Sequence, residues 1–332
     1  MSLAIIPDPV ILTSADTDSI FASHAFRALI AREFRLQAVQ LELSTDGKPF
    51  TIPAFARDNL LGNKTLILGA GFDKTGYIPG IADTDYTPMI GQLVNELAST
   101  GIRMLEIRTA QHIPCLVDES DKVELNIDLQ PSLEQLWSQL SGNTRKNIRR
   151  PLRQGFSAVT GSTPELLDEF YTLYRMSLHD IGSLPHPRHF FTDLLAQCPN
   201  QTDIFVGYME GKPVVASFNF TSQDEIYGAW AGIHRDYKKH NVFLAMLWKI
   251  TEHCAATGRK TYNLGRSSAG GNQHQFKLKL ANRSHRIYYY RINIKPPRKA
   301  RSRVQNAASW LIRNTPAIVM DGLARTLLHR YY

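Results

Sequence analysis

Residues that could bind and polarise an anion are concentrated between Asn241 and Lys277. A helix is predicted to begin near Asn241, where an N-cap residue and free backbone N–H groups favour an anion. A strand is predicted to end at Leu264-Gly265-Arg266-Ser267, and Gln275-Phe276-Lys277 follows after a loop of small residues. Arg266 could hold a phosphate or carboxylate through two parallel hydrogen bonds, and Lys277 could stabilise a negative charge. These residues therefore predict a site for a ligand or intermediate that carries negative charge.

A second group of cations is Arg145-Lys146-Asn147-Ile148-Arg149-Arg150 followed by Arg153, five cations in nine residues. Such a run is either a solvated helix face or a surface that contacts phosphate groups or a charged polymer. We select Arg145, Lys146 and Arg149 as candidate substrate-binding residues.

A third basic segment, residues 295–303, is interrupted by prolines and leads into a helical pattern over residues 304–332. Cations followed by an amphipathic helix are typical of attachment to an anionic membrane surface. The alternative is a helix that packs against its own domain.

Composition excludes several classes of protein. The 332 residues are 43% hydrophobic and 20% charged, which excludes wholesale disorder, and 38 cations against 30 anions give a net charge of +8, too mild for a dedicated nucleic-acid binder. Three scattered cysteines, Cys115, Cys198 and Cys254, predict neither a disulfide framework nor a metal site. No signal peptide and no membrane-spanning stretch are expected, and we predict a cytoplasmic protein, with attachment to the inner membrane through the tail as an alternative.

Hydrophobic periodicity predicts two similar α/β arrangements in series. In the first third it predicts helices over 23–34 and 87–100 and strands over 36–43, 48–57, 64–68, 103–108 and 122–128. After a connecting helix that Ser132 caps, it predicts helices over 164–179, 187–197 and 241–257 and strands over 156–160, 203–209, 212–221, 225–233, 260–264 and 286–294. This order excludes a plain doubly wound dinucleotide fold. We expect domains over residues 1–131 and 132–295, and a basic linker with a helical tail over 296–332.

An ordered series of short motifs resembles the FemAB-like acyltransferases of the GNAT superfamily. The motifs are Trp137, Arg145-Lys146-Asn147-Ile148-Arg149-Arg150, Phe170-Tyr171…Tyr174, Asp180-Ile-Gly-Ser-Leu-Pro185, Phe190-Phe191, Gly211-Lys-Pro-Val-Val-Ala216, Tyr227…Trp230-Ala231, Gly265-Arg266-Ser267 and Phe276-Lys277. With the tail residues Trp310-Leu311…Pro316…Gly322-Leu-Ala-Arg325, the chain is most similar to the subgroup found with exosortase (PEP-CTERM) and exopolysaccharide systems. The resemblance covers residues 132–332 well and residues 1–131 only in general.

The resemblance implies an α/β (α+β) fold: two tandem GNAT-like domains with mixed, largely antiparallel sheets and a C-terminal helical tail. It also implies transfer of an acyl or aminoacyl group to an amine on a cell-envelope or exopolysaccharide precursor that bears a phosphate or a lipid. The co-substrate would be acyl-CoA or aminoacyl-tRNA, with no tightly bound cofactor and no metal. Residues 235–241 lack the glycine pattern that cradles the CoA pyrophosphate in ordinary GNAT enzymes.

Attack of an amine on a carbonyl needs a bound donor, a group that stabilises the oxyanion and a proton acceptor. We expect Lys277, Arg266 and Asp180 to be catalytic, with His179 and His234 as other candidates for the base. We expect Tyr227, Trp230, Asn241 and Phe276 to contact substrate, although a tyrosine or tryptophan on a strand, as Tyr227 and Trp230 are, more often belongs to the core. Two alternatives remain: an acyl-CoA-dependent enzyme acting on a small amine, and a non-catalytic scaffold that binds a phosphate-bearing ligand or RNA through its basic cluster.

Overall fold

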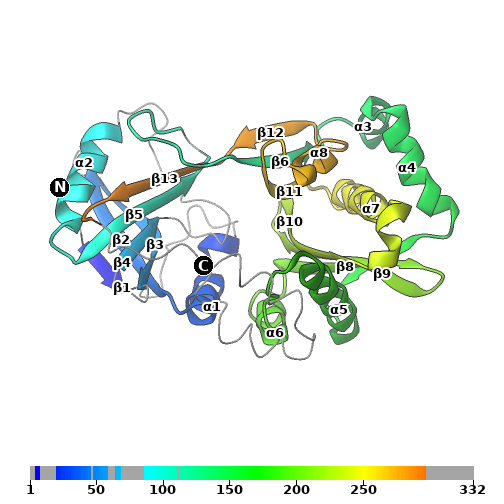
Figure 1. The fold of residues 1–332 in the computed structure, drawn as a ribbon, viewed down its shortest axis with the longest axis horizontal. Helices are drawn as coiled ribbons and strands as arrows, with labels where there is room; N and C mark the ends of the chain where they lie inside the picture. Colours follow the sequence, from blue (N-terminus) through cyan, green and yellow to red (C-terminus); the bar gives the residue numbers. More distant parts are fainter. Residues whose placement is uncertain are drawn as a thin grey trace. The chain divides into compact units, whose positions relative to one another are not determined.

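The computed structural model describes residues 4–7, 20–45, 48–58, 64–68, 86–110 and 112–296. The chain forms two compact units (Figure 1). Of the described residues, those up to Lys122 and those from Arg286 onward form the first unit, and residues 123–285 form the second.

The first unit is a six-stranded sheet with helices on both faces. Its elements are β1 (Ala4–Pro7), η1 (Ile20–Ala22), α1 (His24–Phe34), β2 (Gln37–Thr45), β3 (Lys48–Asp58), β4 (Lys64–Leu68), α2 (Tyr86–Leu97), β5 (Ile102–Thr109) and β13 (Tyr288–Asn293). The strand order is β1-β2-β3-β4-β5-β13, in which the pair β4–β5 is parallel and the others are antiparallel. A parallel pair needs a crossover connection, and α2 lies between these two strands in the sequence.

Alternation along the strands gives this sheet one apolar face. Leu66, Leu105 and Ile107 pack there against Ile90 and other apolar residues of α2. On the other face, the buried Arg27 of α1 lies over the ring of Phe55 and donates hydrogen bonds to the Val39 and Ala54 carbonyls. Both helices are thereby fixed to the sheet.

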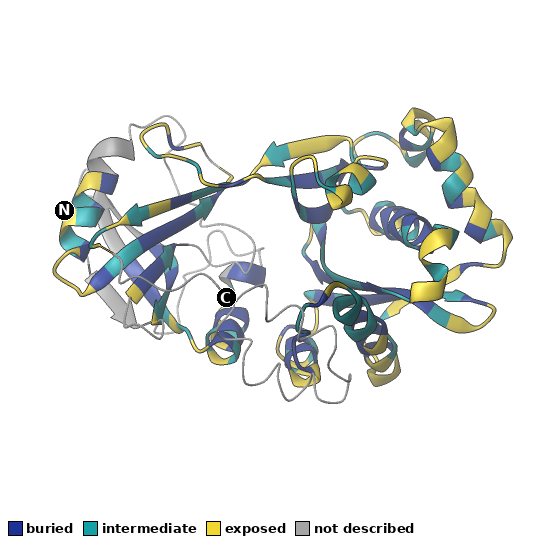
Figure 2. Cartoon of the chain, viewed as in Figure 1, coloured by how far each residue is buried: buried dark blue, intermediate teal, exposed yellow. Residues whose placement is uncertain are grey.

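The second unit is a seven-stranded sheet with the strand order β12-β6-β11-β10-β9-β8-β7. Its elements are β6 (Lys122–Asp128), α3 (Leu133–Gln139), α4 (Gly142–Arg153), β7 (Ser157–Gly161), α5 (Pro164–Ile181), α6 (Arg188–Gln197), β8 (Thr202–Met209), β9 (Lys212–Thr221), β10 (Glu225–Ile233), η2 (Arg235–His240), α7 (Val242–Ala256), β11 (Thr261–Ser268), α8 (Asn272–Lys277) and β12 (Arg283–Arg286). Figure 1 shows α7 on one face of the sheet and α5 and α6 on the other. The helix α7 is buried along most of its length (Figure 2).

The predicted fold class is confirmed: both sheets are mixed, and most strand pairs are antiparallel. The division of the chain differs from the expected one at 131/132. The strand β6 belongs to the second sheet, and β13 returns to the first, where Tyr290 pairs with Ile107. Tyr290 is fully buried and belongs to the apolar core of the first unit. The predicted basic linker and tail, apart from Pro296, lie outside the described residues.

Candidate functional site

The two central strands of the second unit separate after a short stretch of pairing. β10 and β11 are parallel and in register from Glu225↔Thr261 to Tyr227↔Asn263, and no further pair between them is found in the described chain. β10 stays paired with β9 up to Ile233. The carboxyl-terminal halves of β10 and β11 therefore form a V-shaped opening, which we call the splay.

A backbone irregularity in β11 fixes the start of the splay. Gly265 has a φ of +72°, and its N–H donates to Asn263 Oδ1 at 2.8 Å. A Cβ at this position would lie 3.0 Å from the Gly228 carbonyl oxygen of β10, so a glycine is favoured on both counts. The strand consequently turns away from β10 at Gly265.

Lys277 is held at this turn. Its Nζ donates to the carbonyl oxygens of Gly265 at 3.1 Å and Arg266 at 2.9 Å. Two of the ammonium donors are thus fixed by the backbone of β11. The structure therefore places the Lys277 ammonium against the backbone of Arg266, close to the end of the β10–β11 pairing.

The open edge of β10 presents backbone N–H groups. His234 donates its N–H to Val214 of β9, so the N–H groups of Ile233 and Ala231 point toward the other edge, from which β11 has diverged. The Ile233 N–H donates to Ser177 Oγ of α5 at 2.8 Å. Sequence reasoning missed Ser177, although its spacing from Tyr174 and Phe170 places a polar residue on the buried face of α5.

A β-bulge brings Tyr227 and Trp230 to the same face of the sheet. Their odd spacing would place them on opposite faces of a regular strand, but the register shifts between Gly228 and Trp230. Both rings contact Phe220, at 6.3 Å and 5.5 Å between ring centroids. Tyr227 is buried and Trp230 half-buried, so both belong to an aromatic cluster beneath α5 and α6.

His186 belongs to the same cluster, with its ring 5.5 Å from that of Trp230. Burial lowers the pKa of His186 to about 3. The unfolded chain, with a histidine pKa of about 6.5, therefore takes up a proton that the folded chain excludes. The free energy of unfolding is therefore unaffected by protonation of His186 above about pH 6.5 and falls as the pH drops from about 6.5 toward 3. By pH 5 this loss of stability is about 2 kcal/mol.

We therefore expect His186→Phe to lose less stability than the wild type between pH 7 and pH 5, by about 2 kcal/mol. Urea unfolding at both pH values measures this difference. An equal loss in both proteins would show that His186 is not the neutral, buried group that the structure indicates.

The carboxylate of Asp180, a candidate general base, takes part in two ion pairs. Its carboxylate pairs with Lys238 at 2.7 Å and with Arg235 at 3.2 Å. Burial raises the pKa of Asp180, but the hydrogen bond and charge of Lys238 and the charge of Arg235 outweigh it, so the pKa lies below its usual value. A carboxylate with a lowered pKa is a weak proton acceptor, and Asp180 instead anchors η2 to α5.

The cations of the basic helix α4 are exposed except for the half-buried Arg145, and two of them also contact α3. Arg145 donates to the Trp137 and Ser138 carbonyls at the end of α3, and the Arg149 guanidinium lies 5.0 Å from the centre of the Trp137 ring. Both side chains therefore join α3 to α4. Lys146, Arg150 and Arg153 are exposed, and Figure 2 shows most of α4 facing solvent.

Asn241 lies at the start of α7, and Phe276 lies in α8. Asn241 precedes α7 with a φ of +59°, and its side chain makes no capping bond but donates to Asn147 Oδ1 at 3.4 Å. The expected N-cap position is thus right, whereas the expected N-cap hydrogen bond is absent from the described contacts. Phe276 stacks on Phe243 of α7, with 5.6 Å between ring centroids.

A cavity of about 450 Å³ lies in the second unit beside α8. Apolar residues of α3, α7 and the segment after α8 form much of its wall, together with Ser141 and Thr144 at the start of α4. None of the site residues predicted from the sequence lines it. Within the described residues, no group of side chains suited to a metal ion and no helix able to cross a membrane is found.

Comparison with known proteins agrees with this geometry. Residues 142–278, which include β10, β11 and Lys277, match the family model of the acetyltransferase (GNAT) domain. No curated protein matches the sequence.

Solved structures extend the similarity to the whole fold. The structure of FemX is 8% identical in sequence and superposes with a TM-score of 0.61. The matched region covers 83% of this chain and 90% of the FemX chain, and the coverages below are given in the same order. The C-terminal domain of a predicted lysylphosphatidylglycerol synthetase from Agrobacterium fabrum has 13% identity and a TM-score of 0.54, with coverages of 92% and 95%. A tandem GNAT protein from the clavulanic acid biosynthesis pathway has 10% identity and a TM-score of 0.51, with coverages of 90% and 100%. The chain therefore has a tandem GNAT-like fold; the similarity to the exosortase-associated subgroup stays a prediction.

Proposed function

We propose that this chain transfers an acyl or aminoacyl group to an amine of a cell-envelope precursor, with the donor carbonyl bound in the splay. The observation that carries the proposal is the Lys277 ammonium, fixed by two carbonyls where β10 and β11 separate. The match of residues 142–278 to a GNAT acetyltransferase domain supports acyl transfer as the reaction class.

In this reaction the amine nitrogen attacks the carbonyl carbon and a C–N bond forms. The carbonyl oxygen becomes an oxyanion, and in this scheme the Ala231 N–H on the open edge of β10 and the Lys277 ammonium stabilise it. The oxyanion then collapses, the bond to the leaving oxygen or sulfur breaks, and the proton lost by the amine ends on the leaving group. Asp180 takes no part in this scheme because two cations hold it.

The segment before α7 favours an aminoacyl ester over acyl-CoA as donor. Residues 235–240 form η2, His234 caps this turn, and no glycine occurs from His234 to Asn241. A loop that wraps a pyrophosphate uses glycines to aim successive N–H groups at it. The similar folds named FemX and lysylphosphatidylglycerol synthetase, the latter named for a product that joins an amino acid to a membrane lipid, support an envelope acceptor.

Filter binding with the full chain tests the donor. We expect saturable retention of ¹⁴C-labelled aminoacyl-tRNA, no comparable retention of uncharged tRNA or ¹⁴C-acetyl-CoA, and transfer of label to an added amino-sugar or peptidyl precursor. Saturable binding of acetyl-CoA alone would overturn the aminoacyl donor and favour acetylation of a small amine. Retention of tRNA regardless of charging, with no transfer to an amine, would favour a binding scaffold.

A further inference from the structure

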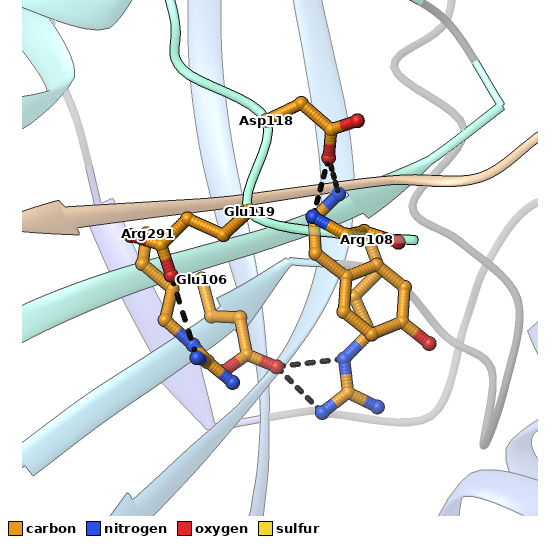
Figure 3. A network of polar contacts seen from close by, with 7 residues as sticks. Glu106, Arg108, Asp118, Glu119 and Arg291 are labelled. Carbon is orange, nitrogen blue, oxygen red and sulfur yellow. Dashed lines mark hydrogen bonds and ion pairs between the residues drawn. The ribbon is translucent and has the colours of Figure 1, made fainter. Parts of the chain in front are cut away.

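On one face of the first unit's sheet, the charges of Arg57, Arg108 and Arg291 act on the buried carboxylate of Glu106. Figure 3 shows Glu106 with Arg108 and Arg291. Glu106 lies on β5, Arg108 follows it by two residues, and Arg291 is its register partner on β13. Arg57 on β3 is opposite Thr65, which is opposite Met104, so the register places Arg57 on the same face as Glu106. The apolar core covers the other face of the sheet.

Both carboxylate oxygens of Glu106 are occupied. Oε1 accepts from Arg108 Nε at 2.6 Å and pairs with Arg108 Nη2, while Oε2 accepts from Arg291 Nε at 3.3 Å. Glu106 is only 1% exposed, whereas the Arg291 side chain is 47% exposed. The buried Glu106 carboxylate therefore fixes the guanidinium groups of Arg108 and Arg291. The Arg291 side chain also reaches solvent.

Within the part of the chain that the structure describes, the guanidinium groups of this cluster outnumber its carboxylates. Arg291 also pairs with the half-exposed Glu119 at 3.4 Å, so two carboxylates face three guanidinium groups. Arg57 makes no side-chain hydrogen bond or ion pair with any residue in the described part of the chain. Arg286, nearby, does not add to the surplus because Asp118 pairs with it at 2.8 Å.

Glu106 and the three arginines shift one another's pKa values, in addition to the effect of burial. Burial raises the pKa of Glu106, but Arg108, Arg291 and Arg57 together bring it below its usual value, so the carboxylate is charged. Burial lowers the pKa of Arg57; Glu106 opposes this, and the charges of Arg108 and Arg291 add to it. An anion beside Arg57 would relieve this repulsion.

We propose that Arg57, Arg108 and Arg291 bind a phosphate monoester or pyrophosphate group on the first unit, with Glu106 as the residue that positions two of them. A guanidinium group can donate two parallel hydrogen bonds to two oxygens of one phosphate. A phosphate monoester or pyrophosphate also carries two or more negative charges, whereas a carboxylate carries one. This inference does not depend on the transfer chemistry of the second unit, because none of its residues belongs to the splay.

Equilibrium dialysis of the full chain with ³²P-pyrophosphate tests the site. We expect saturable binding that weakens at least about tenfold in Arg57→Gln and in Arg291→Gln, with partial recovery in Arg57→Lys. Arg188→Gln, in which an exposed arginine of the second unit loses its partner Asp168, is the matched control and should bind as the wild type does. Acetate at equal concentration should not compete.

Three results would overturn the proposal. One is the absence of saturable pyrophosphate binding by the wild type. Another is binding that Arg57→Gln and Arg291→Gln leave unchanged but a double change of Lys146 and Arg150 to glutamine on α4 abolishes, since α4 would then be the phosphate site. The third is equal competition by acetate, which would indicate a general carboxylate or ionic-strength effect. Circular dichroism identifies any variant that fails to fold, and pyrophosphate-induced thermal stabilisation of the wild type gives a readout that needs no variant.

Discussion

Lys277→Ala is expected to lower the rate of acyl transfer by about 10²- to 10³-fold, the usual effect of removing one donor to an oxyanion. The ammonium is fixed by the carbonyls of Gly265 and Arg266, so it is already oriented before the donor binds. A preorganised charge of this kind acts mainly on the transition state, and we expect the loss in kcat rather than in KM. Single-turnover transfer from labelled aminoacyl-tRNA measures it.

Two comparisons separate catalysis from folding in this experiment. The variant also loses two hydrogen bonds, worth about 1 kcal/mol each, which is small against a typical domain stability of about 5–15 kcal/mol. Lys260→Ala is the matched control, because Lys260 precedes β11 and pairs only at the surface with Asp224. If Lys277→Ala transfers as fast as Lys260→Ala while both retain wild-type circular dichroism, the splay is not the transfer site.

Local signals in the sequence predicted the elements well. The connecting helix begins at Ser132 as expected, and the structure shows why: Ser132 and Gln135 form a capping box. Helices such as α5 and α7 were predicted because their apolar residues recur at helical spacing, which depends on the sequence nearby.

Pairing over long sequence distances was not predicted. Residues 286–294 were expected to form a strand, yet nothing in that segment indicates that it pairs with β5, whose partner residues are about 180 positions away. Asp180 was one of three candidates for the base, beside His179 and His234. Its partners Arg235 and Lys238 are more than fifty residues away in sequence, and only the fold brings them together.

The surroundings of the candidate site residues depend on the same long-range pairing. The sequence singled out Arg266 and Lys277 as two cations that follow one strand, and the structure adds the hydrogen bond from Lys277 to the Arg266 carbonyl. The bulge that aligns Tyr227 with Trp230 has no signal in the sequence. Glu106 and Arg108 alternate on a predicted strand and so indicate one charged face, but Arg57 and Arg291 join them only through the register of four strands.

Gly232→Ala is expected to destabilise the second unit by about 3 kcal/mol, at the upper end of the usual cost of overpacking. A Cβ on Gly232 would lie well inside 3.0 Å of the Leu173 carbonyl carbon and the Tyr174 nitrogen, both backbone atoms of α5. Backbone atoms cannot rotate out of the way as a side chain can, so α5 would have to move away from β10. Urea unfolding followed by tryptophan fluorescence measures the loss.

Gly142→Ala is the control for this change, because a Cβ there meets nothing within 4 Å. At this first position of α4, alanine should be neutral or stabilising by up to about 1 kcal/mol. Equal unfolding midpoints in the two variants would mean that α5 does not pack closely on β10.

The close approach of α5 to β10 also brings Ser177 within hydrogen-bond distance of the Ile233 N–H at the open end of β10. Gly232→Ala should therefore reduce transfer even below the urea concentration at which the unit unfolds, because the strand edge proposed to bind the oxyanion is held in place through the same helix.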